Sequence, residues 1–147
     1  MTHTQMQEYL HKQIPLSKAM GIEVNEIQEG RVVLEVPLEP NINHRATAFG
    51  GSISAAAILA CWTLLHMRLN AVIDSTRLVI HKNKMVYRKP ISGRFQAMCA
   101  LPGDSTWPDF MTMLEQHNKA KIILCADIIY DNEKAGEFTG SFVAMKD

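Results

Sequence analysis

The chain has 147 residues and a mass of 16.5 kDa, which suits one domain (1–147) with its own hydrophobic core. Hydrophobic residues make up 47% of the sequence and charged residues 20%, a balance that argues against intrinsic disorder. Fifteen basic and fifteen acidic residues give a formal net charge of zero, so the basic excess that a nucleic-acid-binding surface needs is absent. A neutral chain repels its own copies only weakly, which is compatible with self-association.

The cysteines and histidines predict a reduced chain without a metal centre. Cys61, Cys99 and Cys125 lie far apart, form no CxxC pair, and each sits in an apolar stretch. We therefore interpret them as reduced core residues of a cytoplasmic protein. Residues 1–13 are polar and lack the apolar core of a signal peptide, so we expect no secretion. The histidines show no HxxxH or HxH spacing, and we expect no metal site.

The first part of the chain predicts a short helix and a β-hairpin. Residues Gln5–Gln13 place apolar side chains on one side of a helix. Alternating apolar residues over Ile22–Ile27 and Arg31–Leu38 predict two strands, and Gly30 between them indicates a hairpin. An irregular loop, Asn41–Phe49, follows the second strand.

A long uncharged run then predicts a buried helix. No Asp, Glu, Lys or Arg occurs between Arg45 and Arg68. A helix over Ser52–Met67 spans about 24 Å at roughly 1.5 Å per residue. A bilayer core is about 30 Å thick, so we expect a core helix and no membrane span.

The remaining sequence predicts strands and one further helix. Strands are expected over Thr76–Ile80, Lys84–Arg88, Arg94–Leu101, Lys121–Tyr130 and Glu137–Met145. The first two are expected to meet at a turn over 81–83, and the last two at a turn containing Asp131, Asn132 and Gly136. Pro108–Lys119 predicts an amphipathic helix. Strands joined by short turns pair antiparallel, so an α+β fold with a sheet wrapped around the long helix follows.

This order of elements resembles the hotdog-fold superfamily of acyl-CoA thioesterases over about residues 15–145. Phe49-Gly50-Gly51-Ser52 is similar to the (H)GG motif that opens the central helix in these proteins, with Phe49 where histidine is common. The stretch Tyr87 to Gly93 is similar to their aromatic-basic-Pro-x-x-Gly sequence. The segment Asn43–Ser52, Trp62 and the inserted helix resemble one subfamily, the YiiD C-terminal-like domain that occurs alone or behind a GNAT acetyltransferase domain.

The resemblance implies an acyl-CoA or acyl-carrier-protein thioester hydrolase that works as a homodimer or a dimer of dimers. Coenzyme A would enter only as part of the substrate, and no other cofactor is implied. Two alternatives stay open. One is a non-catalytic hotdog domain that binds acyl groups or mediates dimerisation. The other is a hotdog hydratase or dehydratase, whose Asn and His resemble Asn43 and His44, although Asn41 replaces the accompanying Asp.

The glycine pair also has a physical interpretation. A helix N-terminus presents unpaired N–H groups and partial positive charge, and glycines let a ligand approach the backbone. Thioester hydrolysis builds negative charge on the carbonyl oxygen, so the N–H groups of Gly51 and Ser52 are candidates for an oxyanion hole. The alternative is that the two glycines only allow a tight turn into the helix.

Activation of water is harder to assign. Many hotdog thioesterases carry an Asp or Glu two turns into the central helix, but residues 55–61 of this chain hold no carboxylate. Asn43 and His44 in the preceding loop are the candidates, with Thr47 and Ser52 as hydrogen-bonding support. Alternatively, Asn43 caps a turn and His44 is a solvated loop residue.

Substrate-binding residues are implied by their place in the family motifs. Thr47, Phe49 and Gly50 precede the central helix, and we expect them beside the thioester. Arg88 and Lys89 match the basic residues near the phosphates of coenzyme A, unless they are ordinary solvated charges. Trp62 is expected in the core or in a dimer interface.

The inserted helix has an apolar side that suggests a cover for the acyl chain. Phe110, Met113 and Leu114 fall at i, i+3 and i+4, on one face of the predicted helix. We expect this face either to cover the acyl chain or to pack on the sheet.

Overall fold

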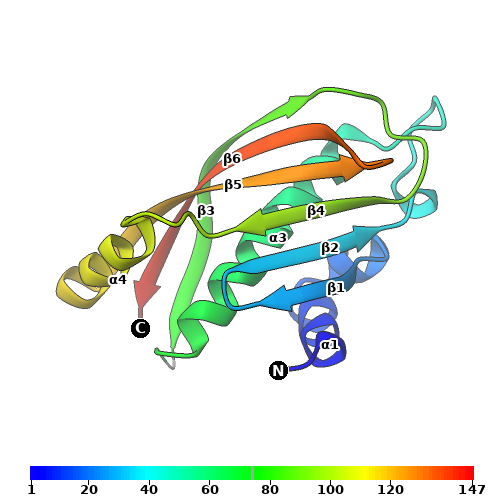
Figure 1. The fold of residues 1–147 in the computed structure, drawn as a ribbon. Coiled ribbons are helices and arrows are strands. Elements are labelled where there is room, and N and C mark those ends of the chain that lie inside the picture. The colour runs from blue at the N-terminus through cyan, green and yellow to red at the C-terminus, as the bar shows by residue number, and fades with distance from the viewer. Residues whose placement is uncertain (74) are drawn as a thin grey trace.

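The computed structural model describes residues 1–73 and 75–147, and an antiparallel sheet curves around a long helix in it (Figure 1). The helices are α1 His3–Gln13, α2 Pro15–Ala19, the short 3-10 helix η1 Glu39–Asn41, α3 Gly50–Asn70 and α4 Thr106–His117. The strands are β1 Glu23–Gln28, β2 Arg31–Val36, β3 Thr76–Tyr87, β4 Phe95–Ala100, β5 Lys119–Tyr130 and β6 Glu133–Lys146. The predicted α+β architecture is therefore confirmed.

The sheet has the strand order β1-β2-β4-β5-β6-β3, and every neighbouring pair is antiparallel. Its inner face packs on α3. In β5, for example, Ile122, Leu124 and Ile128 are buried, while Ile123 between them is exposed. This two-residue period lets one face of the strand bury apolar side chains against the helix while the other face remains open.

α3 is longer than the sequence predicted. Its 21 residues span about 31 Å at 1.5 Å per residue. It is therefore long and apolar enough to cross a membrane, with a mean hydropathy of 1.4 over its most apolar window, and helix length alone does not decide its environment. However, 56% of that window is buried inside the fold, because the sheet wraps around the helix. Packing, rather than length, supports its interpretation as a core helix.

The predicted hairpin at residues 81–83 is wrong, because β3 runs without a turn from Thr76 to Tyr87. The register with β6 shifts by one residue between Ile80 and Lys82, which is a β-bulge. β3 lies at the edge of the sheet, so its polar residues face solvent while the strand continues. A polar triplet on an edge strand therefore resembles a turn in the sequence.

The turn between β5 and β6 is shorter than expected. It consists of Asp131 and Asn132, whose φ angles of 53° and 61° fit the type I′ turn of a two-residue hairpin. Gly136 lies inside β6 and not in the turn. The turn therefore needs no glycine, because Asp and Asn tolerate the left-handed region.

The expectation that all three cysteines are core residues is wrong for Cys125. Cys61 and Cys99 are buried, but Cys125 is exposed because the alternation of β5 turns it to the outer face of the sheet. Burial raises the pKa of the Cys61 thiol well above its usual value, so this thiol stays protonated near neutral pH. Cys61 is therefore a packing residue.

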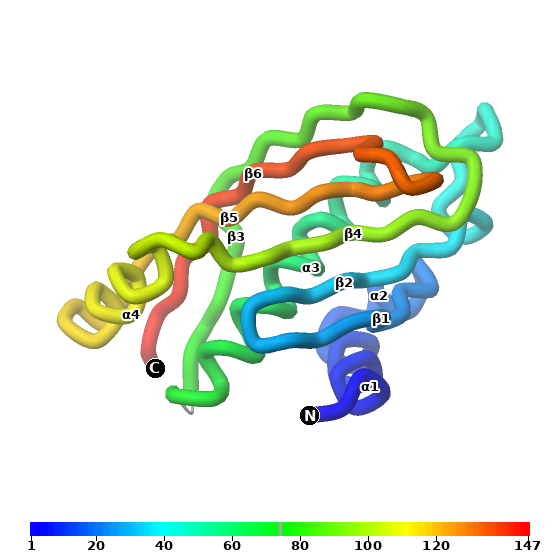
Figure 2. Tube along the Cα trace, in the orientation of Figure 1, coloured from blue at the N-terminus to red at the C-terminus, as the bar shows by residue number. Residues whose placement is uncertain are grey.

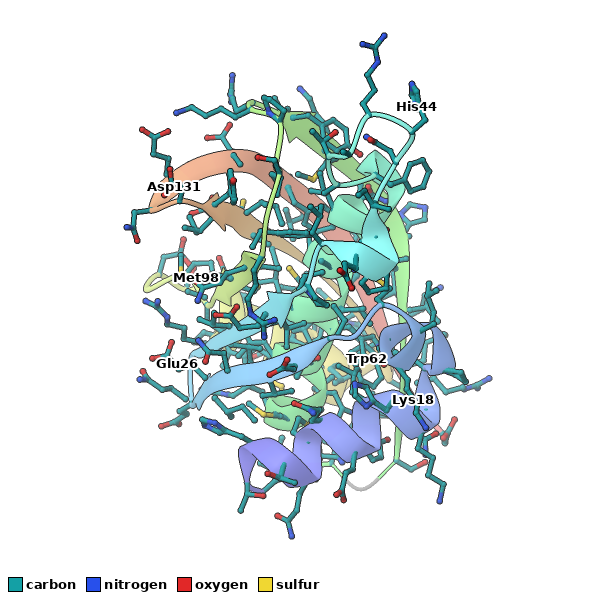
Figure 3. The ribbon with its side chains drawn as sticks, turned by 90° about the vertical axis from the view of Figure 1, so that its right-hand side faces the viewer. Lys18, Glu26, His44, Trp62, Met98 and Asp131 are labelled. Atoms are coloured by element: carbon teal, nitrogen blue, oxygen red, sulfur yellow. The ribbon has the colours of Figure 1, made fainter. Side chains whose placement is uncertain are left out.

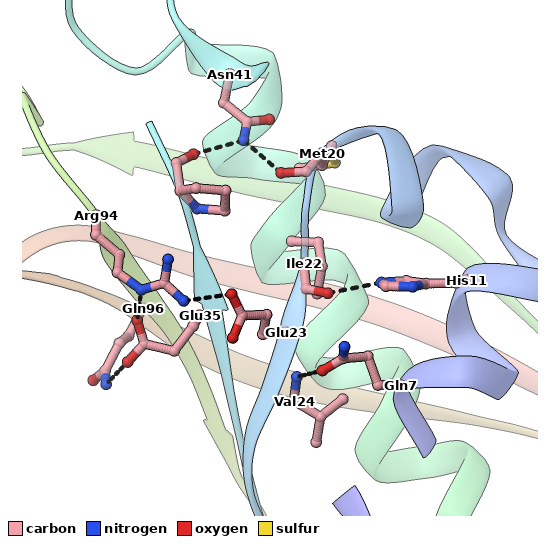
Figure 4. A network of polar contacts seen from close by, with 11 residues as sticks. Gln7, His11, Met20, Ile22, Glu23, Val24, Glu35, Asn41, Arg94 and Gln96 are labelled. Atoms are coloured by element: carbon pink, nitrogen blue, oxygen red, sulfur yellow. Dashed lines mark hydrogen bonds and ion pairs between the residues drawn. The ribbon is translucent and has the colours of Figure 1, made fainter. Parts of the chain in front are cut away.

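The two edges of the sheet differ in how they are covered. Side chains of α1 hydrogen-bond to the β1 edge: Gln7 Oε1 accepts from the Val24 N–H at 2.9 Å, and His11 Nε2 lies 2.7 Å from the Ile22 carbonyl oxygen (Figure 4). No hydrogen bond within the described residues reaches the outer edge of β3. The β3 edge therefore offers free backbone groups.

α4 lies at the C-terminal end of α3. The guanidinium of Arg68, in the last turn of α3, lies 4.9 Å from the centre of the Trp107 ring in α4. Arg68 is 18 residues after Gly50, which corresponds to about 27 Å along α3. Phe110 and Leu114 are buried in the core, whereas Met113 is 48% exposed. The apolar side of α4 therefore packs against the sheet far from the glycine pair, as the second of the two expectations for this helix stated.

Candidate active site

The N-terminus of α3 presents two unpaired backbone donors. Phe49 is the N-cap residue, with extended φ and ψ of −64° and 133°, and no side chain in the described part of the protein caps the helix. The N–H groups of Ser52 and Ile53 both donate to the Phe49 carbonyl oxygen, at 3.0 and 3.1 Å. The N–H groups of Gly50 and Gly51 have no acceptor among the described residues. The free donors at the positive end of this helix are therefore those of Gly50 and Gly51, whereas the N–H of Ser52 is occupied.

Aromatic rings lie against both glycines. A Cβ at Gly51 would come within 2.4 Å of the Phe49 ring, which is closer than real Cβ atoms approach. A Cβ at Gly50 would lie 3.4 Å from the ring and hydroxyl of Tyr87. Phe49 and Tyr87 are themselves 56% and 52% exposed, so both rings border solvent beside the helix start. Gly51 is thus required for the close approach of Phe49.

The two sequence motifs, 37 residues apart, meet at this point. The Tyr87 hydroxyl donates to the Gly50 carbonyl oxygen at 2.9 Å, and the Ala48 N–H donates to the Ile91 carbonyl oxygen at 2.8 Å. The segment after β3 passes beside the loop that precedes α3 (Figure 2). A pocket of about 310 Å³ opens between them. Its lining residues are Ala48, Gly50, Ile53, Tyr87, Arg88, Lys89, Pro90 and Ile91.

Tyr87 is a site residue that the sequence did not assign. It belongs to the quoted motif, but only the fold shows that its side chain reaches Gly50. β3 ends at Tyr87, where it pairs with Gly136 of β6, and this pairing fixes the direction of the side chain.

Arg88 and Lys89 line the pocket as half-exposed cations with carboxylate partners. Arg88 Nη2 lies 2.6 Å from Glu137 Oε2, and Lys89 pairs with Glu133. The hydrogen bond from Arg88 lowers the pKa of the Glu137 carboxyl, so this residue stays ionised at neutral pH. Ion pairs exposed to water contribute little net stability, so another anion can replace these carboxylates.

Asn43 organises the loop before α3. Its Oδ1 accepts from the N–H groups of Arg45 and Thr47 at 2.8 and 3.1 Å, and its Nδ2 donates to Thr47 Oγ1 at 2.9 Å. Ala46, inside this turn, has a φ of 62°. Both ends of the Asn43 amide are therefore hydrogen-bonded within the loop, which agrees with the turn-capping interpretation.

The other predicted site residues are placed around this loop. His44 is exposed at its tip and points away from the body of the protein (Figure 3). Thr47 and Ser52 are half-buried. Of the predicted residues, the pocket brings together Gly50, Arg88 and Lys89, while the rest of the set lies outside its lining: Asn43, His44, Thr47, Phe49, Gly51 and Ser52.

Trp62 lies in an aromatic stack, far from the glycine pair. Its ring is 4.9 Å from that of His66, which in turn stacks on Tyr9 of α1 at 4.7 Å. Burial lowers the pKa of the His66 imidazole, so the ring is neutral at physiological pH. Stacking of these three rings packs α1 against α3. Elsewhere in residues 1–73 and 75–147, no three His, Cys, Asp or Glu side chains are grouped to hold a metal ion.

Comparison with known proteins identifies the family. The family described as "Putative thioesterase (yiiD_Cterm)" matches residues 3–146. The chain belongs to this family. The sequence-based resemblance to hotdog-fold thioesterases is thereby confirmed, including the subfamily.

Solved structures show the same fold. A protein of unknown function from Chlorobaculum tepidum TLS is 30% identical, with a TM-score of 0.88 over 99% of this chain and 94% of that one. A "putative thioesterase" from Shewanella oneidensis is 24% identical, with a TM-score of 0.85 over 97% and 96% of the two chains. A mutant of a thioesterase enzyme from Staphylococcus aureus is 12% identical, with a TM-score of 0.70 over 89% and 98%. The two more distant structures support the fold alone.

Proposed function

We propose that the chain hydrolyses acyl-CoA or acyl-carrier-protein thioesters in the cytoplasm. The observation that carries this proposal is the pocket in which Gly50, at the start of α3, faces the segment Tyr87–Ile91. In the proposed reaction, a water oxygen attacks the thioester carbonyl carbon, the carbon–sulfur bond breaks, and the sulfur leaves as a thiol. The products are a carboxylic acid and coenzyme A or the carrier thiol.

The free N–H groups of Gly50 and Gly51 support the role of this helix start as an oxyanion hole. The carbonyl oxygen becomes negative as water attacks, and backbone donors aimed at it lower the barrier. The N-terminus of α3 adds partial positive charge. Preorganised backbone donors need no side-chain movement during the reaction, so this role fits a rigid helix end.

Arg88 and Lys89 are proposed to bind the phosphates of coenzyme A. Both side chains line the pocket that contains Gly50. Phosphate would displace Glu137 and Glu133 from them, because charge-assisted hydrogen bonds to phosphate are strong and the existing ion pairs are exposed.

A homodimer joined along β3 is proposed to complete the site. Water activation needs a proton acceptor, and α3 carries no carboxylate. His44 is exposed at the tip of its loop, where a second subunit can meet it. The β3 edge is open while the β1 edge is covered by α1, so edge pairing favours β3. A further dimer of dimers is compatible with this arrangement.

Light scattering tests the assembly. We expect a mass of about twice 16.5 kDa, or a multiple of that, at micromolar concentration. A stable species at 16.5 kDa would contradict both the dimer and a site shared between subunits.

Release of free thiol from a panel of acyl-CoAs and acyl carrier proteins tests the hydrolase itself. We expect turnover of at least one chain-length class, at a rate proportional to enzyme concentration. A non-catalytic acyl-binding domain is the second candidate, favoured by the absence of a carboxylate at residues 55–61 and by the fully hydrogen-bonded Asn43 amide. Acyl-CoA binding without thiol release would support that candidate and contradict hydrolysis.

A hydratase is the least supported activity. The position where hydratases carry Asp is Asn41 here, which is only 2% exposed and whose Nδ2 donates to the carbonyl oxygens of Met20 and Pro37 (Figure 4). The Asn41 amide therefore links the start of the loop to the segments that contain Met20 and Pro37. An amide cannot accept a proton as the carboxylate of a hydratase does.

A further inference from the structure

The Tyr87 hydroxyl and the free Gly51 N–H lie at opposite ends of one peptide unit. Tyr87 donates to the Gly50 carbonyl oxygen at 2.9 Å. That carbonyl is bonded to the nitrogen of Gly51, whose N–H has no acceptor among the described residues. A hydrogen bond to the carbonyl oxygen of an amide alters the electron density at its nitrogen, because resonance couples the two atoms.

We propose that Tyr87 is a positioning residue, one that fixes the Gly50–Gly51 peptide and strengthens the Gly51 N–H as a donor to the thioester oxyanion. A hydrogen bond accepted by the carbonyl draws electron density from the nitrogen, so the N–H becomes more positive. Such coupling strengthens successive hydrogen bonds by roughly 10–30% each. The inference rests on the proposed hydrolase and adds a residue to its machinery.

The placement of Tyr87 suits this task. β3 carries it to the mouth of the pocket, and the N–H of the next residue, Arg88, donates to the Ala135 carbonyl oxygen at 2.8 Å. The phenol ring also lies at van der Waals distance from the place a Gly50 Cβ would occupy, 3.4 Å away. The Tyr87 hydroxyl therefore donates from the sheet to the first peptide of α3. This hydrogen bond fixes the position of the helix start relative to the end of β3.

The test compares Tyr87→Phe with a matched control, Tyr130→Phe. Phenylalanine keeps the ring against Gly50 and removes only the hydroxyl. Tyr130 is a suitable control because its ring also lies against a glycine, 3.3 Å from a Cβ at Gly93, and its hydroxyl lies 3.0 Å from Ser92 Oγ instead of a helix carbonyl.

Two readouts are measured: steady-state kinetics and the backbone ¹⁵N resonance of Gly51. Losing a whole oxyanion-hole donor lowers kcat by about 10²–10³-fold. If the hydrogen bond from that donor is weakened by roughly 10–30%, the same fraction of the free energy is lost, and kcat falls about two- to eightfold. We expect this loss in Tyr87→Phe with KM little changed, together with an upfield shift of the Gly51 ¹⁵N resonance. Tyr130→Phe should change neither kcat nor the Gly51 resonance.

An unchanged Gly51 resonance in folded Tyr87→Phe would overturn the inference, and so would a shifted resonance with wild-type kcat. A loss confined to KM would also overturn it, since polarisation of an oxyanion donor acts in the transition state. Absence of turnover by the wild-type protein would instead contradict the proposed hydrolase, while the Gly51 resonance would still decide whether Tyr87 polarises this amide.

Discussion

Gly51→Val should lower kcat/KM for thioester hydrolysis by about 10²-fold or more, because a side chain that blocks an oxyanion-hole donor costs about as much as losing that donor. The new side chain would occupy the space where the Phe49 ring now lies, 2.4 Å from a Cβ at this position. It would also crowd the approach of the thioester to the free N–H groups of Gly50 and Gly51. Because Gly51 and Phe49 are exposed, the ring can move aside and the domain should stay folded.

Two variants separate this effect from simpler causes. Gly103→Val introduces the same side chain at a glycine where a Cβ would meet no atom of the described residues within 4 Å, and it should behave as wild type. Phe49→Ala removes the displaced ring alone. A full loss of activity in Phe49→Ala would attribute the effect to the aromatic ring, and wild-type kinetics in folded Gly51→Val would exclude this helix start as the site.

Asn43→Ala should lower kcat more than it raises KM and should also destabilise the fold. The variant removes the acceptor for the Arg45 and Thr47 N–H groups and the donor to Thr47 Oγ1. Hydrogen bonds of this kind contribute about 0.5–1.5 kcal/mol each, so losing the three should lower the free energy of unfolding by about 1.5–4.5 kcal/mol. A loop displaced by about 1 Å next to the reacting groups can cost roughly 10²-fold in rate. Urea unfolding and steady-state kinetics measure the two effects.

Asn43→Asp serves as the companion variant. It keeps an oxygen for the Arg45 and Thr47 N–H groups and loses the Nδ2 donor. We expect it to retain more stability than Asn43→Ala. A fall in kcat without any fall in stability in both variants would indicate that Asn43 orients the attacking water. Wild-type kinetics in both would remove Asn43 from the site.

Local sequence patterns determined most of the fold. The uncharged run between Arg45 and Arg68 predicted a buried helix because a charge is too costly in a core that surrounds the helix. The alternation over Ile22–Ile27 and the turn at Gly30 predicted the hairpin of β1 and β2, since a strand repeats every two residues. The glycine pair marked the helix start correctly to within two residues. In each case the signal is local in the sequence.

Tertiary structure decided where these elements meet. Nothing near residues 81–83 distinguishes a turn from an exposed edge strand, because both are polar; the pairing of β3 with β6 settles it. The exposure of Cys125 likewise depends on which face of β5 meets α3. Tyr87 reaches Gly50 only because the end of β3 and the start of α3 come together in the folded sheet. Contacts of this kind join residues far apart in the chain, and they are fixed by packing of the whole core, for which no short segment of sequence carries the information.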